Sequence, residues 1–210
     1  MQQELLPLFP LQVVVFPRTP IALHIFEERY KDMVGDAIER NAEFGIVLAS
    51  EKGIVNSGCT AVVDRVVQKY PDGRMDIVAA GRRRFELMEL NDELAYLRGA
   101  VEFFDDDEEA QSSTPGLRDE ALARYYELVK LEGQSPLLDP ELFENQLSFQ
   151  IAQVISDVHM RQLLLVSRSE AERMQQIATY LPTLLRQRRE LAQAQRSAAT
   201  NGHHKRPLGL

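Results

Sequence analysis

The residues LLPLFPLQVVVFPRTPIALHIFEERY, Leu5–Tyr30, set the architecture that we expect for this chain. They are rich in Val, Ile, Leu and Phe, which pack well in half-buried strands. Four prolines, Pro7, Pro10, Pro17 and Pro20, divide the stretch at short intervals. Because proline breaks a helix interior and cannot donate to a central strand ladder, one long helix is excluded here. The stretch therefore predicts short buried or edge strands that open a compact β-rich domain.

The chain then continues to Phe104 with one short helix and several strands. Helical spacing of apolar residues, with acidic residues in the first turn, predicts a helix over Glu27–Asn41. The sequence Pro71-Asp72-Gly73 predicts a hairpin turn, since Asp-Gly tolerates the positive φ angles of a tight turn. Apolar runs predict strands over 43–49, 59–70, 75–80 and 96–104, with a further run from Phe85. Strands at such short spacing are typical of a small barrel or sandwich.

The composition changes at Asp105–Thr114, DDDEEAQSST, an acidic and polar stretch without a large apolar residue. Such a stretch cannot offset its own ordering entropy, so it predicts a solvated linker. After it the apolar residues recur at helical spacing. We therefore expect an α+β protein with a β-rich domain over 1–104, a linker over 105–114, a helical bundle over 115–196 and a disordered tail over 197–210.

Local signals place the helices of this bundle. One helix should run from Pro115 to Gly133, and a second should follow the cap Asp139-Pro140. Ser169 and the glutamate three residues later form a capping box, which begins the last helix. Pro182 should kink that helix, and its polar end over 186–196 should fray.

Charge limits the classes of partner. Lys plus Arg total 24 against 32 Asp plus Glu, which gives a net charge of −8 and a pI near 5.1. This balance opposes general binding to a phosphate backbone. We therefore do not expect nucleic acid as a partner unless the fold gathers a local basic patch.

Three features predict a cytoplasmic location. Cys59 is the single cysteine, so no intramolecular disulfide can form. The start Met-Gln-Gln-Glu lacks the basic and apolar regions of a signal peptide. The longest apolar runs fall short of the roughly 18–20 residues that span a bilayer, so we expect no membrane segment.

The sequence shows no convincing catalytic or cofactor motif. Gly53–Thr60 has the spacing of a phosphate-binding loop, but Cys59 stands where that loop needs lysine. We interpret the segment as a glycine-marked turn into a strand, with Cys59 as a small buried hydrophobe. His24 fits a structural histidine on a strand, and His159 lies at a helix start with nothing to orient it as an acid or base. We therefore expect no metal, no cofactor and no enzymatic activity.

A basic cluster, GRRRF, occupies Gly81–Phe85 between acidic segments. Strand alternation would send Arg82 and Arg84 to one face of a sheet and Arg83 to the other. Two interpretations are open at this point. The arginines either pair with the excess acids at the surface or contact peptide backbone and acidic groups through their fork of donors.

Motifs spread along the chain converge on one family. The longest are LPLFPL at 6–11, VVVFP at 13–17 and IALHIFEERY at 21–30. Shorter ones are GCTA at 58–61, PDGR at 71–74 and GRRRF at 81–85, followed in the helical region by Leu163-Leu164, Ser167, Glu172-Arg173 and Met174. Together they resemble the amino-terminal substrate-binding domain of Lon ATP-dependent proteases, over about residues 5–190.

This resemblance implies a PUA-like β-barrel with one inserted helix, followed by a helical bundle. In Lon such a module engages client proteins and helps subunits associate. The chain has no usable phosphate loop and no segment that resembles the serine–lysine peptidase region. We therefore expect a stand-alone, non-catalytic module that binds unfolded or partly unfolded proteins and peptides, and we leave open whether it forms a homo-oligomer.

We expect the binding surface in an apolar groove on the barrel, in a groove between barrel and bundle, or along an exposed strand edge. Aromatic and arginine side chains combine contact area with directional donors. Each aromatic residue is also a candidate for the core. The candidate peptide-binding residues are Phe16, Pro17, Arg29, Tyr30, Arg82, Arg83 and Phe85.

Two other function classes stay open. PUA-like barrels also occur in RNA-binding proteins, and salt-sensitive RNA binding that depends on Arg82–Arg84 would indicate that class. A small hydrolase that acts without ATP is the third class. It would need a nucleophile, a base and an orienting group together, and the sequence shows no such set.

Overall fold

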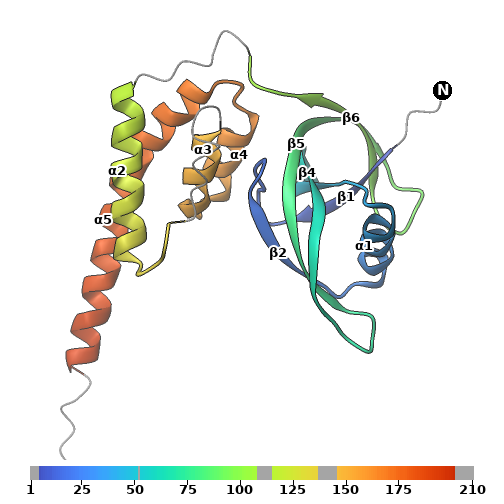
Figure 1. Ribbon diagram of the computed structural model, residues 1–210, viewed down its shortest axis with the longest axis horizontal. Coiled ribbons are helices and arrows are strands. Elements are labelled where there is room, and N and C mark those ends of the chain that lie inside the picture. Colours follow the sequence, from blue (N-terminus) through green and yellow to red (C-terminus); the bar gives the residue numbers. More distant parts are fainter. Residues whose placement is uncertain (1–4, 52, 108–114, 137–145, 202–210) are drawn as a thin grey trace, which may run out of the picture.

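The computed structural model of the protein describes residues 5–51, 53–107, 115–136 and 146–201 (Figure 1). Its strands are β1 (Leu6–Leu11), β2 (Pro20–Ile25), β3 (Phe44–Ser50), β4 (Gly53–Lys69), β5 (Met75–Asn91) and β6 (Arg98–Phe104). Its helices are α1 (Glu28–Arg40), α2 (Pro115–Leu131), α3 (Leu147–Ile151), the 3-10 turn η3 (Ala152–Val154), α4 (Val158–Val166) and α5 (Glu170–Asn201). The expected α+β class is confirmed.

The strands form one sheet whose order is β2-β5-β4-β3-β1-β6, and β6 also pairs with β5. The pairings therefore run in a ring from β5 through β4, β3, β1 and β6 back to β5. β2 pairs with β5 outside this ring, as an edge strand. The pairing of β1 with β3 is parallel, since β2 and α1 lie between them in the chain.

The helix α1 covers the strand-rich part (described residues 5–107) on the side away from the other helices (Figure 1). Tyr30, Met33 and Val34 of α1 are buried against the strands, and the Tyr30 ring lies 4.3 Å from the ring of Phe9. The helix ends at Asn41, whose φ of 49° is left-handed. Asparagine tolerates that conformation, so the chain can turn directly into β3.

One apolar core continues from the strand-rich part into the helical part (described residues from 115 onward). Phe16 stacks on Phe149 of α3, with ring centroids 5.2 Å apart. Beyond that contact, Leu128 of α2 and Leu181 of α5 are fully buried. The two parts therefore share hydrophobic packing along their junction.

The strand pattern differs from our expectation at two places. β4 begins at Gly53, although we expected a loop before residue 59, and the two predicted runs over 75–80 and from Phe85 form one strand, β5. A Cβ at Gly58 would lie 2.6 Å from Phe85 Cζ and 2.4 Å from the carbonyl oxygen of Ile46. Glycine here admits the Phe85 ring inside the sheet and does not mark a loop.

The expected alternation of the arginines is wrong. Between two successive pairs with β4, β5 has one residue more than its partner. At this bulge the backbone N–H of Arg83 donates to Thr60 Oγ1 at 3.0 Å. A bulge redirects the side chains that follow it, so Arg84 is buried while Arg82 and Arg83 are both exposed.

The last helix is longer than expected. α5 continues through Pro182 to residue 201, so both the end that we expected to fray, 186–196, and the first residues of the expected tail are helical. Arg189 forms an ion pair with Glu127 of α2, and Arg188 forms one with Glu132, just beyond the end of α2. Packing and ion pairs with α2 therefore extend this polar helix.

Three sequence predictions fall partly outside the described residues. The expected second helix corresponds to α3 and η3, but its predicted start after Asp139-Pro140 lies outside them. Residues 108–114 of the expected linker and 202–210 of the expected tail also lie outside them.

Candidate functional site

The strand-rich part meets the helical part along the segment between β1 and β2, Gln12–Thr19. Val14, Val15 and Phe16 of this segment are buried. Residues 16–19 form a tight turn, in which Thr19 Oγ1 donates to the Phe16 carbonyl at 2.8 Å and accepts from the Phe16 N–H at 3.3 Å. The threonine hydroxyl thus fixes a turn that directs Phe16 towards the helices.

Gly81 of β5 holds this segment in place. Its N–H donates to the Thr19 carbonyl at 3.0 Å, and its carbonyl accepts from the Arg18 N–H at 2.8 Å. A Cβ at Gly81 would lie 2.1 Å from the Phe16 carbonyl oxygen. Only glycine allows the two backbones to approach so closely, so the first residue of GRRRF has a structural role.

At one end of the junction lies a buried ion-pair group that we call the Arg173 cluster: Arg84, Asp106, Ser148, Glu170 and Arg173. Arg173 has no exposed surface, and its Nη2 lies 2.5 Å from Asp106 Oδ2 and 2.7 Å from Glu170 Oε2. Arg84 Nη2 donates to Asp106 Oδ1 at 2.6 Å, and Ser148 Oγ donates to Glu170 Oε2 at 2.6 Å. Two cations face two anions, so the cluster is neutral overall.

The environment of the Arg173 cluster favours the charged forms of Asp106 and Arg173, whereas burial lowers the pKa of Arg84. Burial raises the pKa of Asp106, but the hydrogen bonds and charges of Arg173 and Arg84 outweigh this and hold that pKa below its ordinary value. Burial lowers the pKa of Arg173, but the hydrogen bonds and charges of Asp106 and Glu170 outweigh it and raise that pKa. The Asp106–Arg173 pair therefore remains ionised at neutral pH.

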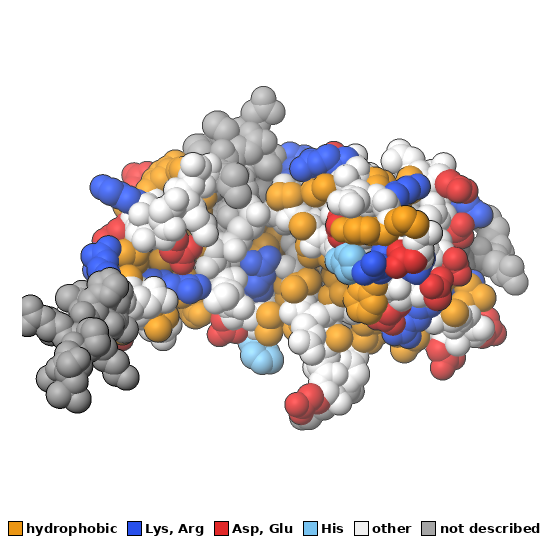
Figure 2. Space-filling view, turned by 90° about the horizontal axis from the view of Figure 1, so that it is seen from below, with side chains coloured by type: hydrophobic (Ala, Val, Ile, Leu, Met, Phe, Trp, Pro, Cys, Tyr) orange, Lys and Arg blue, Asp and Glu red, His pale blue; other side chains and the backbone are white. Residues whose placement is uncertain are grey.

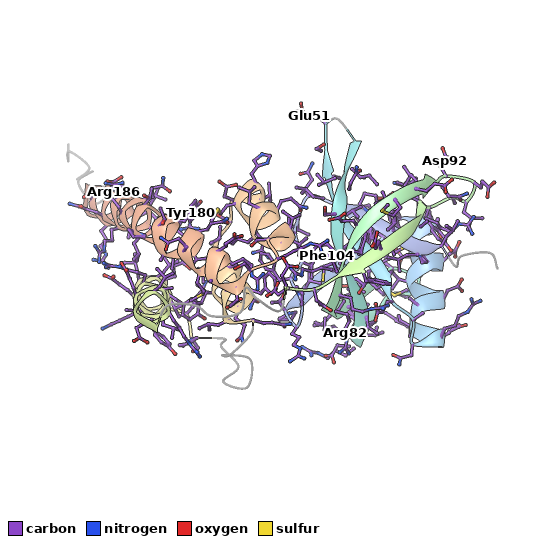
Figure 3. The ribbon with its side chains drawn as sticks, turned by 90° about the horizontal axis from the view of Figure 1, so that it is seen from above. Glu51, Arg82, Asp92, Phe104, Tyr180 and Arg186 are labelled. Carbon is purple, nitrogen blue, oxygen red and sulfur yellow. The ribbon has the colours of Figure 1, made fainter. Side chains whose placement is uncertain are left out.

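Asp106 belongs to the stretch that we expected to be a solvated linker, and for this residue the expectation is wrong. Its side chain is only 16% exposed. The next residue, Asp107, donates its N–H to the Arg168 carbonyl at 2.9 Å. Arg84 also donates to the Leu165 and Ser167 carbonyls of the helical part. The chain after β6 is thus fixed to the helices by the cluster; in Figure 3, Phe104 marks this end of β6, facing the helices.

At the other end of the junction, Arg161 of α4 extends to the Gln12–Thr19 segment. Its Nε and Nη2 donate to the Val14 carbonyl at 3.2 and 2.7 Å. Its Nη1 donates to the carbonyls of residues 152, 153 and 155 at 3.2–3.4 Å. In the part of the chain that the structure describes, no carboxylate pairs with it. Burial lowers the pKa of Arg161 to about 10, so the guanidinium still carries its charge at neutral pH.

Arg161 also lines a cleft of about 600 Å³ between the strand-rich part and the helical part. Both walls are largely apolar. The strand-rich part contributes Val13, Val14, Val15, Pro20 and Ile21, and the helical part contributes Val129, Val154, Ile155 and Val158. Figure 2 shows a hollow between the two parts that contains hydrophobic and basic side chains. Apolar walls of this kind favour apolar ligand groups.

Polar side chains are interspersed in the same cleft. Gln12, Gln134 and Gln153 line it, and a primary amide can both donate to and accept from a peptide backbone. Two further lining residues, Glu132 and Arg188, form an ion pair at 3.3 Å. The cleft therefore combines apolar surface, amide groups and the Arg161 charge.

The aromatic residues that we predicted as contacts lie in the core. Phe16 and Phe85 have no exposed surface, and Tyr30 is 6% exposed. Pro17 is buried as well and lines a second, smaller cavity of about 190 Å³ beside the Arg173 cluster. These four residues therefore belong to the interior, where Phe16 packs against Phe149 and the Arg161 guanidinium.

The predicted arginines are exposed but are not gathered into one patch. Arg29 pairs with Glu27 at 2.8 Å, and Arg83 pairs with Glu43 at 3.0 Å. Arg82 lines the smaller cavity and is labelled in Figure 3. With Arg84 buried in its cluster, GRRRF forms no continuous basic surface.

Sequence reasoning missed the residues that build the junction. Asp106 is one of several consecutive acids, and nothing local marks it as buried. Arg173 lies three residues after Glu170, a spacing that indicates a helical ion pair but not its burial. Arg161 has the clearest signal, because it is the one arginine or lysine in α4, a helix of mostly apolar residues.

The described residues also limit the chemistry. They contain no group of three or more His, Cys, Asp or Glu side chains that could hold a metal ion. Cys59 is buried, and burial raises the pKa of its thiol to about 12, so it is a poor nucleophile. None of the described helices combines the length and the apolar character needed to cross a bilayer.

The sequence of the chain matches one protein family and several curated proteins. The family model of the ATP-dependent protease La (LON) substrate-binding domain matches residues 5–185. Similar curated proteins are the Lon proteases of Parabacteroides distasonis, 27% identical over 112 residues, and of Dictyoglomus thermophilum, 23% identical over 195 residues. The matches cover 49% and 85% of this chain but only 14% and 24% of those proteins. The chain thus spans less than a quarter of the length of these relatives.

Two solved structures share the fold. A Lon N-terminal domain protein from Xanthomonas campestris superposes with a TM-score of 0.66 at 22% identity, over 84% of this chain and 98% of that one. The N-terminal domain of Mycobacterium avium complex Lon protease gives a TM-score of 0.59 at 16% identity, over 85% and 98% of the two chains. At these identities the likeness concerns the fold alone.

Proposed function

The chain belongs to the family of ATP-dependent protease La (LON) substrate-binding domains, and we propose that it binds unfolded or partly unfolded protein segments in the cleft between its two parts. The observation that carries this proposal is the cleft itself, about 600 Å³ in volume with apolar walls on both sides. The chain contributes binding and no catalysis of its own, and it acts in the cytoplasm.

The chemistry of the cleft suits an extended chain better than a folded surface. Unfolded segments expose apolar side chains that the valine-rich walls can cover. They also expose backbone N–H and carbonyl groups, which the lining glutamines can satisfy. Pro20 and Ile21, the first residues of the edge strand β2, border the cleft, so a bound segment can continue along that edge by strand addition.

Fluorescence anisotropy with a labelled, permanently unfolded protein tests the proposal. Reduced and carboxymethylated α-lactalbumin is the probe, and Val13→Asp is the variant, because Val13 lines the cleft and is 40% exposed. A charge on this apolar wall should weaken binding about ten-fold. The matched control is Val67→Asp, at a residue of β4 that is 61% exposed and does not line the cleft.

Two results would contradict the proposal. Absence of saturable binding by the unchanged protein would remove the binding function. Equal weakening by Val13→Asp and Val67→Asp would place the binding surface elsewhere.

The RNA-binding alternative gains no support from the arginines. Arg84 is buried and Arg83 is paired with Glu43, so GRRRF offers no run of free cations to a phosphate backbone. With a net charge of −8, the chain lacks the electrostatic footprint of an RNA-binding domain.

A further inference from the structure

The junction holds its arginines in two different ways. Arg84 and Arg173 face carboxylates, and their charges are cancelled by Asp106 and Glu170. Arg161 is half-buried, donates to backbone carbonyls and lies over the Phe16 ring at 4.7 Å, but no carboxylate of the described residues pairs with it. A cation removed from much of its water is costly without an anion, so its position beside an apolar cleft favours a counter-charge.

The charges of the cleft add up to one unmatched cation. Three charged side chains line it: Arg161, Arg188 and Glu132. Arg188 and Glu132 pair with one another at 3.3 Å and cancel. The remaining charge is that of Arg161, so the described lining of the cleft is electrostatically complementary to one anionic group.

The guanidinium of Arg161 also has one N–H group without an acceptor among the described residues. Its Nε–H and one N–H of Nη2 are directed to the Val14 carbonyl, and Nη1 is shared among three carbonyls. Nη2 carries a second hydrogen, for which the described residues provide no acceptor. A carboxylate at this position would form a charge-assisted hydrogen bond in surroundings of low dielectric constant, where such bonds are strong.

The cleft places its one unpaired cation directly beside apolar walls, which come from the Gln12–Thr19 segment, the start of β2 and the helical part. The carboxy-terminal end of an apolar peptide has the matching chemistry, because its carboxylate is directly joined to residues with apolar side chains. Building on the proposed function, we propose that the cleft binds the carboxy-terminal end of apolar peptides, with the terminal carboxylate on Arg161 and the preceding apolar side chains on the valine walls.

One comparison of peptides tests this site on the unchanged protein. A fluorescein-labelled library of apolar hexapeptides is prepared once with free carboxylates and once as carboxy-terminal amides, and binding is measured by anisotropy. The acids should bind at least about ten-fold more tightly than the amides, because a hydrogen bond to a charged group is lost in the amides. Equal affinity of acids and amides would overturn the carboxylate site but leave the proposed function intact. Absence of binding by both, and by unfolded α-lactalbumin, would overturn both.

A third library distinguishes the source of the carboxylate. It consists of amidated peptides that end in aspartate or glutamate, so the negative charge is on a side chain. These peptides should bind no better than the plain amides. Binding equal to that of the free acids would overturn the assignment to the chain terminus.

Substitution of the arginine provides the second readout. Arg161→Gln should reduce the ratio of acid to amide affinity to about one. The matched control is Arg168→Gln, since Arg168 is an exposed arginine just beyond α4 that does not line the cleft, and this variant should keep the ratio of the unchanged protein. A full acid preference in folded Arg161→Gln would overturn the proposal. If this variant fails to fold, the acid and amide comparison on the unchanged protein decides alone.

Discussion

The two ends of the junction between strands and helices accommodate arginine charges in different ways. At the Arg173 cluster, two buried arginines meet two carboxylates, and the group is neutral. At the cleft, Arg161 is held by carbonyl groups and the Phe16 ring, and no carboxylate of the described residues compensates its charge. The first arrangement fixes the two parts together, and the second leaves a binding group available beside an apolar wall.

The largest expected effect is a difference in the free energy of unfolding between variants of Arg173 and Arg161. Arg173→Met leaves Asp106 and Glu170 without their shared cation, so we expect a loss of about 3–5 kcal/mol in the free energy of unfolding. Arg161→Met strands carbonyls but no charge, so we expect a loss of about 1–2 kcal/mol. Urea unfolding measures both. Arg65→Met, at a side chain 65% exposed, is the control and should stay within about 0.5 kcal/mol. Equal losses for Arg173→Met and Arg161→Met would remove the contrast between the two ends.

The next effect concerns pH. Asp106→Asn should cost about 2–3 kcal/mol at pH 7, somewhat less than a fully buried pair, because the Asp106 side chain keeps some contact with water. The pKa of Asp106 is depressed in the folded state. Its stabilisation is therefore present above the unfolded-state pKa, near 4, and is lost as the pH falls through the lower folded-state value. Unfolding of both proteins between pH 7 and pH 3 checks this. A difference that is constant with pH would show that Asp106 does not act through its charge.

A smaller effect tests the support of the cleft wall. Gly81→Ala places a Cβ against the Phe16 carbonyl and should cost about 1–3 kcal/mol while weakening peptide binding, since Gln12–Thr19 must move. Gly35→Ala is the matched control, because a Cβ there meets nothing within 4 Å and lies inside α1. It should stabilise by up to about 1 kcal/mol. A neutral Gly81→Ala would indicate that the segment tolerates displacement.

The smallest signal is the reactivity of Cys59, whose backbone pairs with that of Arg84 in the sheet. With a thiol pKa of about 12 and a buried side chain, it should not react measurably with a thiol reagent at pH 8 until the protein unfolds. Arg173→Met should accelerate the reaction by opening that end of the junction. Rapid labelling of the unchanged protein would contradict the burial on which the cluster depends.

The sequence predicts the fold through features that are local. The prolines and apolar runs of Leu5–Tyr30 give β1 and β2, and helical spacing gives α1. The loop that we expected before residue 59 was wrong, because in sequence a glycine that makes room for a ring inside a sheet cannot be distinguished from a glycine in a loop. The predicted alternation of Arg82, Arg83 and Arg84 was wrong because the bulge in β5 arises from its pairing with β4, which local sequence does not show.

The candidate site was less predictable than the fold. A cleft lies between strands and helices, one of the three places where we expected binding. Phe16, Tyr30 and Phe85 belong to the core instead, since a single sequence does not say which strand face is outward. Asp106 and Arg161 bond to residues that are distant in the sequence. Asp106 pairs with Arg173, 67 residues away, and Arg161 donates to the carbonyl of Val14, 147 residues away. Such long-range pairing leaves little trace in local composition.

Site-specific photo-crosslinking gives the most direct test of binding in the cleft. A benzophenone amino acid replaces Val13 at the cleft or Val67 on the far strand, and each protein is illuminated with reduced and carboxymethylated α-lactalbumin. We predict crosslinks from position 13 that free hexapeptide acids compete away, and few from position 67. Equal or stronger crosslinking from position 67 would contradict binding of unfolded chains in the cleft.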